Sequence, residues 1–377
     1  MKLEVHHHCE DFTTYRAARV KSLFNAESGC NFDLSVELPL EDQPWQLGVI
    51  VGPSGSGKSS LGELVLGPDA FYRPQDWPAD APIVDAIAPE GGFNDVTAAL
   101  AAVGLGDVPS WLRPYPVLST GEKFRADLAR IVAEAPARVV VDEFTSTIDR
   151  QIAKIGALAF QKAWRRTGGQ AVLLTCHHDV LEWLEPDWIY DTGARRFARD
   201  RLQRPRIELE VWETDWRYWP LFEPHHYLKA GPMPAARCYV GTVDGAPVAH
   251  LGMASANRGG VAEARACRLV IMPEWQGAGI GMRFLNQVCE LQLRGEGHLR
   301  GRPVTTIFHT SHPGLCAALR RDRHWRQVSA ALHGVNRRES ARTQAKANAF
   351  APGYGGHFRA VQGFRFYGDA GVAAVAS

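Results

Sequence analysis

The chain has 377 residues, of which 45% are apolar and 22% are charged, and its formal net charge is +1. This composition is typical of folded globular proteins and excludes a largely disordered polypeptide, and the length predicts two or three domains. No apolar run approaches the roughly 18 residues that a membrane-spanning helix needs, so we expect no membrane segment.

The near-zero net charge conceals two oppositely charged halves. Residues 1–200 carry 19 Lys and Arg against 28 Asp and Glu, a net charge of −9. Residues 201–377 carry 23 against 13, a net charge of +10. We therefore predict two domains, 1–200 and 201–377, that meet in an arginine-rich stretch around Pro205 and have different partners.

Strand-like and helix-like segments alternate in the first half. Residues 32–40 alternate apolar and polar side chains, as a half-buried strand does. Three short apolar runs are typical of buried strands, and they lie at 47–51, 139–141 and 171–175. We expect helices over 61–66 and 123–135. Buried strands separated by helices predict an α/β fold with a parallel sheet.

A glycine-rich segment follows the run at 47–51 and precedes the helix expected at 61–66. It matches the phosphate-loop pattern G-x-x-x-x-G-K-[ST] in the strand–loop–helix context that the pattern requires. Backbone N–H groups would surround phosphate oxygens, Lys58 would reach the β and γ phosphates, and Ser59 would ligate Mg²⁺. The predicted nucleotide-binding residues are Gly52, Ser54, Gly55, Gly57, Lys58, Ser59 and Ser60.

Two carboxylates follow the strand expected at 139–141. Asp142 suits Mg²⁺ binding, either directly or through a water molecule. Glu143 suits polarisation of the attacking water, so we predict it as a catalytic residue. Beside a phosphate loop, this pair predicts hydrolysis of ATP rather than ATP binding alone.

The segment Leu118-Ser-Thr-Gly-Glu122, followed by a helix, resembles the signature L-S-G-G-Q of the ABC-type ATPases. Thr120 and Glu122 stand at its third and fifth positions. Ser119 would cap the helix and, with the backbone of Gly121, would bind a γ-phosphate. In that family the signature of one protomer completes the phosphate-loop site of another, which implies a homodimer around ATP.

Two further segments continue the resemblance in family order. Thr145–Asp149 looks like the D-loop, and residues 175–179 look like the switch-histidine segment. Spacing favours His177 as the catalytic histidine, whereas His178 directly precedes Asp179, as the family's histidine does. Both histidines therefore remain candidates.

The resemblance also implies a glutamine that helps to bind Mg²⁺. Gln75 is the candidate, although its short interval from Lys58 implies that the usual small β-subdomain is trimmed. The Mg²⁺ set is then Ser59, Gln75 and Asp142. Tyr15 or Phe24 would stack on adenine, and core packing is the alternative for both.

The second half begins with segments that alternate like strands, at 207–212, 238–243 and 247–251. A turn at Asp244-Gly245 joins the last two. A further strand over 265–272 leads into a glycine-rich loop and then an amphipathic helix. One face of that helix carries Met282, Leu285, Cys289 and Leu293.

This strand–loop–helix unit resembles motif A of the GNAT acetyltransferases, [QR]-x-x-G-x-[GA]. The resemblance implies a GNAT-like α+β domain whose loop holds the pyrophosphate of acetyl-CoA or another acyl-CoA through backbone N–H groups. The cofactor-binding residues that it implies are Leu269, Val270, Gln276, Gly277, Gly279, Ile280 and Gly281.

The catalytic end departs from the usual GNAT pattern. A tyrosine general acid often lies on the helix after the fifth strand, but Leu319 stands near that position. The polar candidates are instead His225, His226 and Tyr227, and Ser311 with its neighbours His309 and His312 after a strand expected at 305–308. For His225 and His226, packing beside Trp216 and Trp219 is the alternative.

The combination of residues 225–228, 268–270, 276–281 and 310–313 is similar to predicted acetyltransferases fused to ABC-type ATPases. It is also similar to the Mom family of phage DNA-modification proteins, which add an acyl-derived group to adenine. The positive charge of this half fits a polyanion such as DNA. Two basic–aromatic clusters strengthen that expectation, or else are solvated faces: Arg320, Arg321, Arg323 and Arg326 around Trp325, and residues 357–359 with 364–366 in a basic C-terminal extension.

Three functions follow from these observations. The first is an ATP-driven transferase that modifies a DNA base. The second is an ATP-regulated N-acetyltransferase for a protein or a small amine. The third is an ATP-switched DNA-binding module whose GNAT-like fold has lost catalysis. The seven cysteines include no C-x-x-C pair, which predicts free thiols and a cytoplasmic location in all three cases.

Overall fold

The computed structural model of the protein describes residues 1–8, 12–24, 31–74, 77–199, 202, 205–226, 231–233, 235–258, 260–331 and 361–369. The chain divides into two compact units, each built from segments that are separated in the sequence. The first unit comprises residues 1–76, 135–150 and 164–204, and the second comprises 77–134, 151–163 and 205–377. Residues 77–134 are thus grouped with the C-terminal half.

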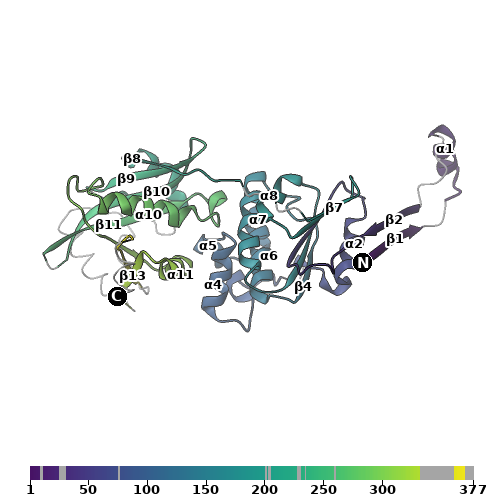
Figure 1. Ribbon diagram of the computed structural model, residues 1–377, viewed down its shortest axis with the longest axis horizontal. Coiled ribbons are helices and arrows are strands. Elements are labelled where there is room, and N and C mark those ends of the chain that lie inside the picture. The colour runs from purple at the N-terminus through teal and green to yellow at the C-terminus, as the bar shows by residue number, and fades with distance from the viewer. Residues whose placement is uncertain are drawn as a thin grey trace. The chain divides into compact units, whose positions relative to one another are not determined.

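A five-stranded sheet forms the centre of the first unit (Figure 1). Its strand order is β4-β5-β3-β6-β7, with β7 antiparallel and all other neighbours parallel. Every residue of β3 is buried, which explains its uninterrupted apolar run. The strands are β3 (Leu47–Val51), β4 (Arg138–Val141), β5 (Gln170–Thr175), β6 (Trp188–Asp191) and β7 (Arg196–Ala198).

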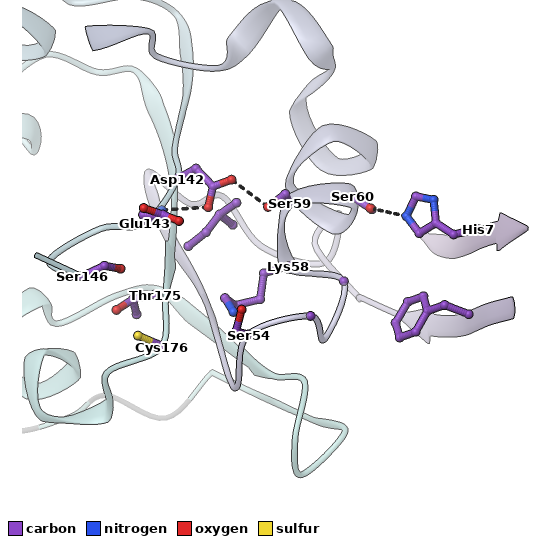
Figure 2. A pocket seen from close by; sticks show the side chains of 14 residues that line it. His7, Ser54, Lys58, Ser59, Ser60, Asp142, Glu143, Ser146, Thr175 and Cys176 are labelled. Carbon is purple, nitrogen blue, oxygen red and sulfur yellow. Dashed lines mark hydrogen bonds between the residues drawn. The ribbon is translucent and has the colours of Figure 1, made fainter. Parts of the chain in front are cut away.

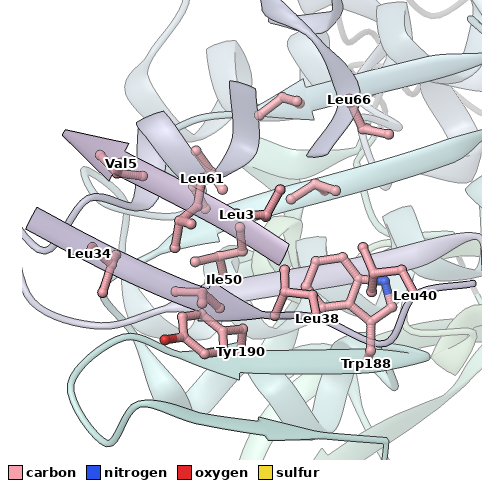
Figure 3. Packing of buried hydrophobic residues seen from close by; sticks show 14 residues of the cluster. Leu3, Val5, Leu34, Leu38, Leu40, Ile50, Leu61, Leu66, Trp188 and Tyr190 are labelled. Carbon is pink, nitrogen blue, oxygen red and sulfur yellow. The ribbon is translucent and has the colours of Figure 1, made fainter. Parts of the chain in front are cut away.

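A two-stranded antiparallel hairpin, β1 (Lys2–His8) with β2 (Asn31–Glu37), packs on this sheet through apolar side chains. Leu3 and Val5 join a buried cluster with Leu61 of α2 and Trp188 of β6 (Figure 3). Three consecutive histidines obscure the alternation of β1, so its sequence pattern does not predict this strand. The helices of this unit are α1 (Tyr15–Phe24), α2 (Lys58–Leu66) and α8 (Leu181–Leu184).

Short helices form the N-terminal part of the second unit. The expected helix at 123–135 is confirmed and begins slightly earlier, at Thr120. It packs against α4, which buries Val96, Ala99 and Leu100. The helices are α3 (Ile83–Ala86), α4 (Phe93–Ala102), α5 (Val108–Trp111) and α6 (Thr120–Glu134), while α7 (Arg150–Trp164) contributes to both units.

A seven-stranded sheet forms the rest of the second unit, in the order β13-β14-β12-β11-β10-β9-β8. All neighbours are antiparallel except β11 and β12, which run parallel. The elements are β8 (Glu210–Thr214), α9 (Trp219–Phe222), β9 (Arg237–Val243), β10 (Ala246–Arg258), β11 (Val261–Ile271), α10 (Ile280–Leu293), β12 (Thr306–Thr310), α11 (Pro313–Arg321), β13 (Trp325–Ala331) and β14 (Val361–Phe366).

Two expectations for this sheet need correction. The strand expected at 207–212 lies at Glu210–Thr214 instead. The buried face of α10 centres on Phe284, Leu285, Val288 and Cys289, whereas Met282 and Leu293 are only half-buried. The turn at Asp244-Gly245 is confirmed, with φ of 50° and 77° at its two residues.

Within the described ranges, no helix combines the length and the apolar character needed to cross a membrane. Five cysteines lie in these ranges, and all five are free thiols: Cys176, Cys238, Cys267, Cys289 and Cys316. Burial raises the pKa of Cys238 to about 12, so its thiol stays protonated at neutral pH.

A histidine lies inside an aromatic cluster of the second unit. The His250 ring is fully buried against Trp216, Trp219 and Phe222, with centroid distances of 5.3–5.6 Å. Its Nδ1 lies 3.4 Å from the carbonyl oxygen of Arg268, and its Nε2 has no hydrogen-bond partner among the described residues. Burial lowers the pKa of His250 to about 4, so the ring is neutral at pH 7.

We predict that this histidine makes the protein less stable in acid. The unfolded chain takes up a proton near the ordinary pKa of 6.5, while the folded ring stays neutral until about pH 4. The stability that it contributes is complete above pH 6.5 and is lost as the pH falls toward 4. Between pH 7.5 and 5, wild type should lose about 2 kcal/mol more than His250→Leu in urea unfolding followed by tryptophan fluorescence. Equal losses in the two proteins would refute the assignment.

Candidate functional site

The phosphate loop connects β3 to α2 and has little steric room. At Gly52, where φ is +150°, a Cβ atom would lie 2.0 Å from the Thr192 Oγ1 atom. At Gly57, where φ is +82°, a Cβ atom would lie 3.0 Å from the Phe32 ring. The Thr192 hydroxyl also contacts the Ser56 hydroxyl at 2.6 Å. The end of β6 and the hairpin therefore enclose the loop, and only glycine fits at these two positions.

A cavity of about 560 Å³ opens beside this loop (Figure 2). That volume is in the range of small-molecule binding sites. The Lys58 ammonium lies in the loop and donates to the carbonyl oxygens of Gly52 and Pro53, at 3.0 and 2.8 Å. The lining residues are His7, Phe32, Ser54, Gly55, Gly57, Lys58, Ser59, Ser60, Asp142, Glu143, Ser146, Leu174, Thr175 and Cys176.

The structure brings Ser59 and the two acids together at this cavity. The Ser59 hydroxyl donates to Asp142 Oδ2 at 2.7 Å, and the backbone N–H of Glu143 donates to Asp142 Oδ1 at 2.7 Å. Glu143 and Thr145 have φ of 50° and 68°, a strained conformation that clusters at functional sites. A hydroxyl and a carboxylate side by side form a hard oxygen donor pair of the kind that Mg²⁺ prefers.

Two lining residues come from the hairpin and were missed by the sequence analysis. His7 Nε2 contacts the Ser60 hydroxyl at 2.7 Å (Figure 2). The His7 and Phe32 rings stack with centroids 6.1 Å apart. Tyr15, an earlier candidate for adenine stacking, is 75% exposed and is not a lining residue. The side chain of Phe24 lies outside the described residues.

The two candidate switch histidines follow β5. His177 precedes a short 3₁₀ turn, and its backbone N–H donates to Thr175 Oγ1 at 3.1 Å. His178 is exposed, and its Nε2 lies 3.0 Å from Asp191 Oδ2. Backbone N–H donation from Ala194 lowers the pKa of Asp191, as does the hydrogen bond with His178. Neither histidine is a lining residue of the cavity. Both remain candidates for the switch histidine.

The signature segment caps helix α6 as the sequence predicts. The Glu122 backbone N–H donates to the Ser119 hydroxyl at 3.4 Å, while Glu122 Oε2 accepts from the Ser119 backbone N–H at 2.8 Å and from its hydroxyl at 2.7 Å. Ser110 also donates to Glu122, at 2.5 Å. Burial alone would raise the pKa of Glu122, but these hydrogen bonds lower it, which favours the ionised carboxylate. The departure at Glu122 thus completes a capping box with Ser119.

Known ATP-binding proteins are similar to part of this chain. A cytochrome c biogenesis ATP-binding export protein of Rhodospirillum rubrum is 32% identical over 164 residues, covering 35% of this chain and 68% of that protein. Its counterpart from Alcanivorax borkumensis is 32% identical over 162 residues, covering 36% of this chain and 70% of that protein. The chain belongs to the ABC-type ATPases.

Solved structures similar to this ABC-type ATPase include a dimeric bacterial ABC transporter cassette. That cassette is 15% identical, with a TM-score of 0.34, and the match covers 46% of this chain and 90% of the cassette. No family model matches the chain. The matches to the relatives named above cover only about a third of this chain.

Several residues predicted to be functional in the ABC-type ATPase belong to its second unit or lie outside the described residues. Gln75 and Tyr227 lie outside them. His225 is exposed, whereas His226 is buried with its ring 5.6 Å from that of Trp219, as the packing alternative expected. The Ser311 hydroxyl is buried and has no hydrogen-bond partner within the described ranges.

His312, considered beside Ser311, has both ring nitrogens engaged in structural contacts. Its Nδ1 accepts from the Leu315 backbone N–H at 3.2 Å, and its Nε2 lies 3.1 Å from the carbonyl oxygen of Gly106. Burial lowers the pKa of His312, so the ring is neutral and caps α11. This geometry makes His312 a structural residue rather than an acid or a base.

The glycine-rich loop before α10 has one covered end and one open end. Gln276 Oε1 accepts from the Gly106 backbone N–H at 3.0 Å, and a Cβ atom on Gly277 would lie 2.8 Å from that of Ala159. Gly279, at the start of α10, is exposed, and no atom lies within 4 Å of the position of an added Cβ. The backbone of Leu269 and Val270 lies in β11 just before this loop.

The aromatic ring of Phe32 should contribute to nucleotide affinity. We expect Phe32→Ala to weaken ATP binding by about tenfold, because stacking of an aromatic ring on a base is worth roughly 1–3 kcal/mol. Calorimetric titration with ATP measures this, and Tyr15→Ala serves as the matched control because Tyr15 lies outside the cavity. A loss of affinity in Tyr15→Ala but not in Phe32→Ala would contradict the assignment.

Proposed function

We propose that this ABC-type ATPase hydrolyses ATP as a homodimer and couples the cycle to a GNAT-like domain that modifies nucleic acid. The proposed acceptor is a base in DNA, and the proposed donor is acetyl-CoA or another acyl-CoA. The observation that carries the proposal is the packed contact, inside one compact unit, between the segment around Gly104 and the glycine-rich loop at Gln276.

The ATPase chemistry rests on four residues of the cavity. Lys58 would exchange its contacts with loop carbonyls for the β and γ phosphates, and Ser59 with Asp142 would hold Mg²⁺, which neutralises phosphate charge when bound. Glu143 would accept a proton from the attacking water. The signature residues Ser119 and Gly121 of a second copy would complete the site, which is why we propose a homodimer.

Sheet topology supports a GNAT-like transferase domain. Strands β11 and β12 pair in parallel only through Ala264, Arg265 and Ala266, although β11 continues to Ile271. Arg268 has φ of 55°, and the register with β10 shifts between His250 and Gly252, so β11 bends beyond its pairing with β12. We propose that the acyl chain of CoA would lie where these two strands part.

Two groups near this divergence of β11 and β12 support the proposed acyl transfer. The open end of the loop at Gly279 begins α10, where backbone N–H groups and the helix dipole favour a pyrophosphate. The buried Ser311 hydroxyl, just after the end of β12, lacks a partner among the described residues and is the proposed group that orients the acceptor or the thioester. A buried hydroxyl without a partner is costly unless a ligand satisfies it.

A tight contact would couple the two activities. Arg125, on the signature helix α6, donates to the carbonyl oxygen of Gly104, and Gly106 donates to Gln276. Arg125 is buried, and burial lowers its pKa to about 10, so it remains a cation at neutral pH. Movement of α6 on ATP binding would therefore reach the loop proposed to hold CoA through two consecutive hydrogen bonds.

The positive charge of the second unit supports an anionic acceptor. Arg321, Arg323 and Arg326 are exposed around Trp325, which is buried at 4% exposure. Arg326 lies over the Tyr367 ring, with its guanidinium carbon 5.3 Å from the ring centroid. Exposed arginines beside an aromatic ring are the groups that bind phosphates and stack on bases. Residues 357–359 of the second cluster lie outside the described residues.

A second candidate function is an ATP-switched DNA-binding module without transferase activity. Leu319, near the position of the usual tyrosine acid, is fully buried and offers no proton. This alternative predicts ATP-dependent DNA binding with no acyl-CoA turnover. The remaining alternative, an N-acetyltransferase for a protein or a small amine, predicts CoA release with free amines.

We predict that Glu143→Gln slows ATP hydrolysis by at least about 100-fold and traps an ATP-bound homodimer, because the proposed base is lost while binding is retained. Phosphate release gives the rate. Light scattering should then show twice the 41.5 kDa mass of one chain in ATP. Lys58→Ala, which should not bind ATP, is the monomeric control. A monomeric Glu143→Gln protein in saturating ATP would contradict the composite site.

We predict a new nucleoside in the DNA of cells that express the wild-type protein and none in cells that express Lys58→Ala. Mass spectrometry of digested DNA measures both. A wild-type digest identical to that of Lys58→Ala would refute DNA modification. CoA release or DNA binding by the same wild-type protein would then separate the two alternatives.

Gly104→Ala tests the coupling separately. A Cβ atom there would lie 2.2 Å from the Gln276 carbonyl oxygen, at a φ of +85°. We expect the DNA modification to fall by at least about tenfold while ATP hydrolysis continues. Gly301→Ala is the matched control, because its φ of +74° is similar and no atom lies within 4 Å of its added Cβ. Full modification by Gly104→Ala would refute the coupling and leave DNA modification standing.

A further inference from the structure

The three histidines of β1 point to two different faces of the hairpin. Side chains alternate along a strand, so His6 and His8 share one face, while His7 lies on the other and reaches Ser60. The β1–β2 register pairs His6 directly with Asp33. Two imidazoles and a carboxylate therefore meet on the exposed face of the hairpin, away from the nucleotide cavity.

The three side chains of this group already lie close to one another. His6 Nδ1 lies 2.7 Å from Asp33 Oδ1, and His8 Nε2 lies 3.5 Å from the same oxygen. The rings of His6 and His8 are nearly parallel, at 10°, with centroids 6.3 Å apart. One ligand atom from each of the three residues lies within 4.8 Å of the others. Tetrahedral ligands about 2 Å from an ion are roughly 3.4 Å apart, so small side-chain rotations suffice.

We propose that His6, His8 and Asp33 bind a divalent transition-metal ion of the Zn²⁺ type, with water completing the coordination. Imidazole nitrogens favour Zn²⁺ over Mg²⁺ or Ca²⁺, which take oxygen ligands. All three residues are exposed, at 56–57% for each side chain, so the ion reaches the site from solvent without unfolding. This metal site is separate from the Mg²⁺ proposed at Ser59 and Asp142.

A neighbouring carboxylate and the position of the hairpin give the site a consequence. Glu4 Oε2 lies 3.7 Å from His6 Nε2, on the same face, where it can orient the ring. The bound ion would fix the end of the hairpin where β1 and β2 carry His7 and Phe32, the two residues that line the nucleotide cavity. The bound ion is therefore inferred to hold this wall of the cavity in place.

Zinc titration of the full chain, free of any affinity tag, tests the site. We expect calorimetry to show one equivalent of Zn²⁺ bound, and the Co²⁺ form to show the visible absorption of a tetrahedral site. His6→Gln and Asp33→Asn should each weaken Zn²⁺ binding by at least about tenfold. Because both residues are exposed, the variants should keep the wild-type circular dichroism spectrum.

His7→Gln is the matched control, since it removes the middle histidine of the same triplet from the opposite face. Zn²⁺ affinity within about threefold of wild type in this variant would support the site, because none of the three proposed ligands is lost. The proposal is overturned if His7→Gln weakens binding as much as His6→Gln does. It is also overturned if His6→Gln leaves Zn²⁺ affinity unchanged, or if the wild-type chain binds no Zn²⁺.

Discussion

The parallel pairing of β3 with β5 on one side and β6 on the other positions the whole nucleotide site. Because the carboxyl ends of parallel strands lie at one edge of a sheet, the phosphate loop after β3 meets Thr175 at the end of β5 and Thr192 just after β6. The neighbouring strand β4 adds Asp142 at the same edge, within hydrogen-bond distance of Ser59. A register shift in this sheet would separate the loop from its acids.

Within the second unit, the segment around Gly104 and the loop at Gln276 bring their backbones close together. Gly104 and Gly277 have positive φ and approach each other closely, and Gln276 links the two segments through the N–H of Gly106. Side chains larger than hydrogen at these glycines would hold the segments apart. Under the proposed function, the same close contact makes the loop at Gln276 sensitive to the position of the signature helix.

The residues that sequence reasoning found are those whose chemistry depends on neighbours in the chain. The phosphate loop, the strand before Asp142 and the capping box at Ser119 each lie within a few consecutive residues, so their patterns are visible without a fold. His7 and Phe32 belong to a hairpin whose strands are more than 20 residues apart in the sequence, and no local pattern links them to Ser60. The basic cluster around Trp325 was ambiguous for a related reason, since alternation alone does not say which side chains the sheet buries.

The sequence by itself determined the family of the first half, the order of its motifs and the strands β3, β4 and β5, because these depend on local hydrophobic patterns and loop chemistry. Tertiary structure alone decided which side chains close the nucleotide cavity and which segment packs on the glycine-rich loop at Gln276. It also decided that His6, His8 and Asp33 share one face. Each of these contacts joins residues far apart in the chain, so strand register and packing, rather than local sequence, bring them together.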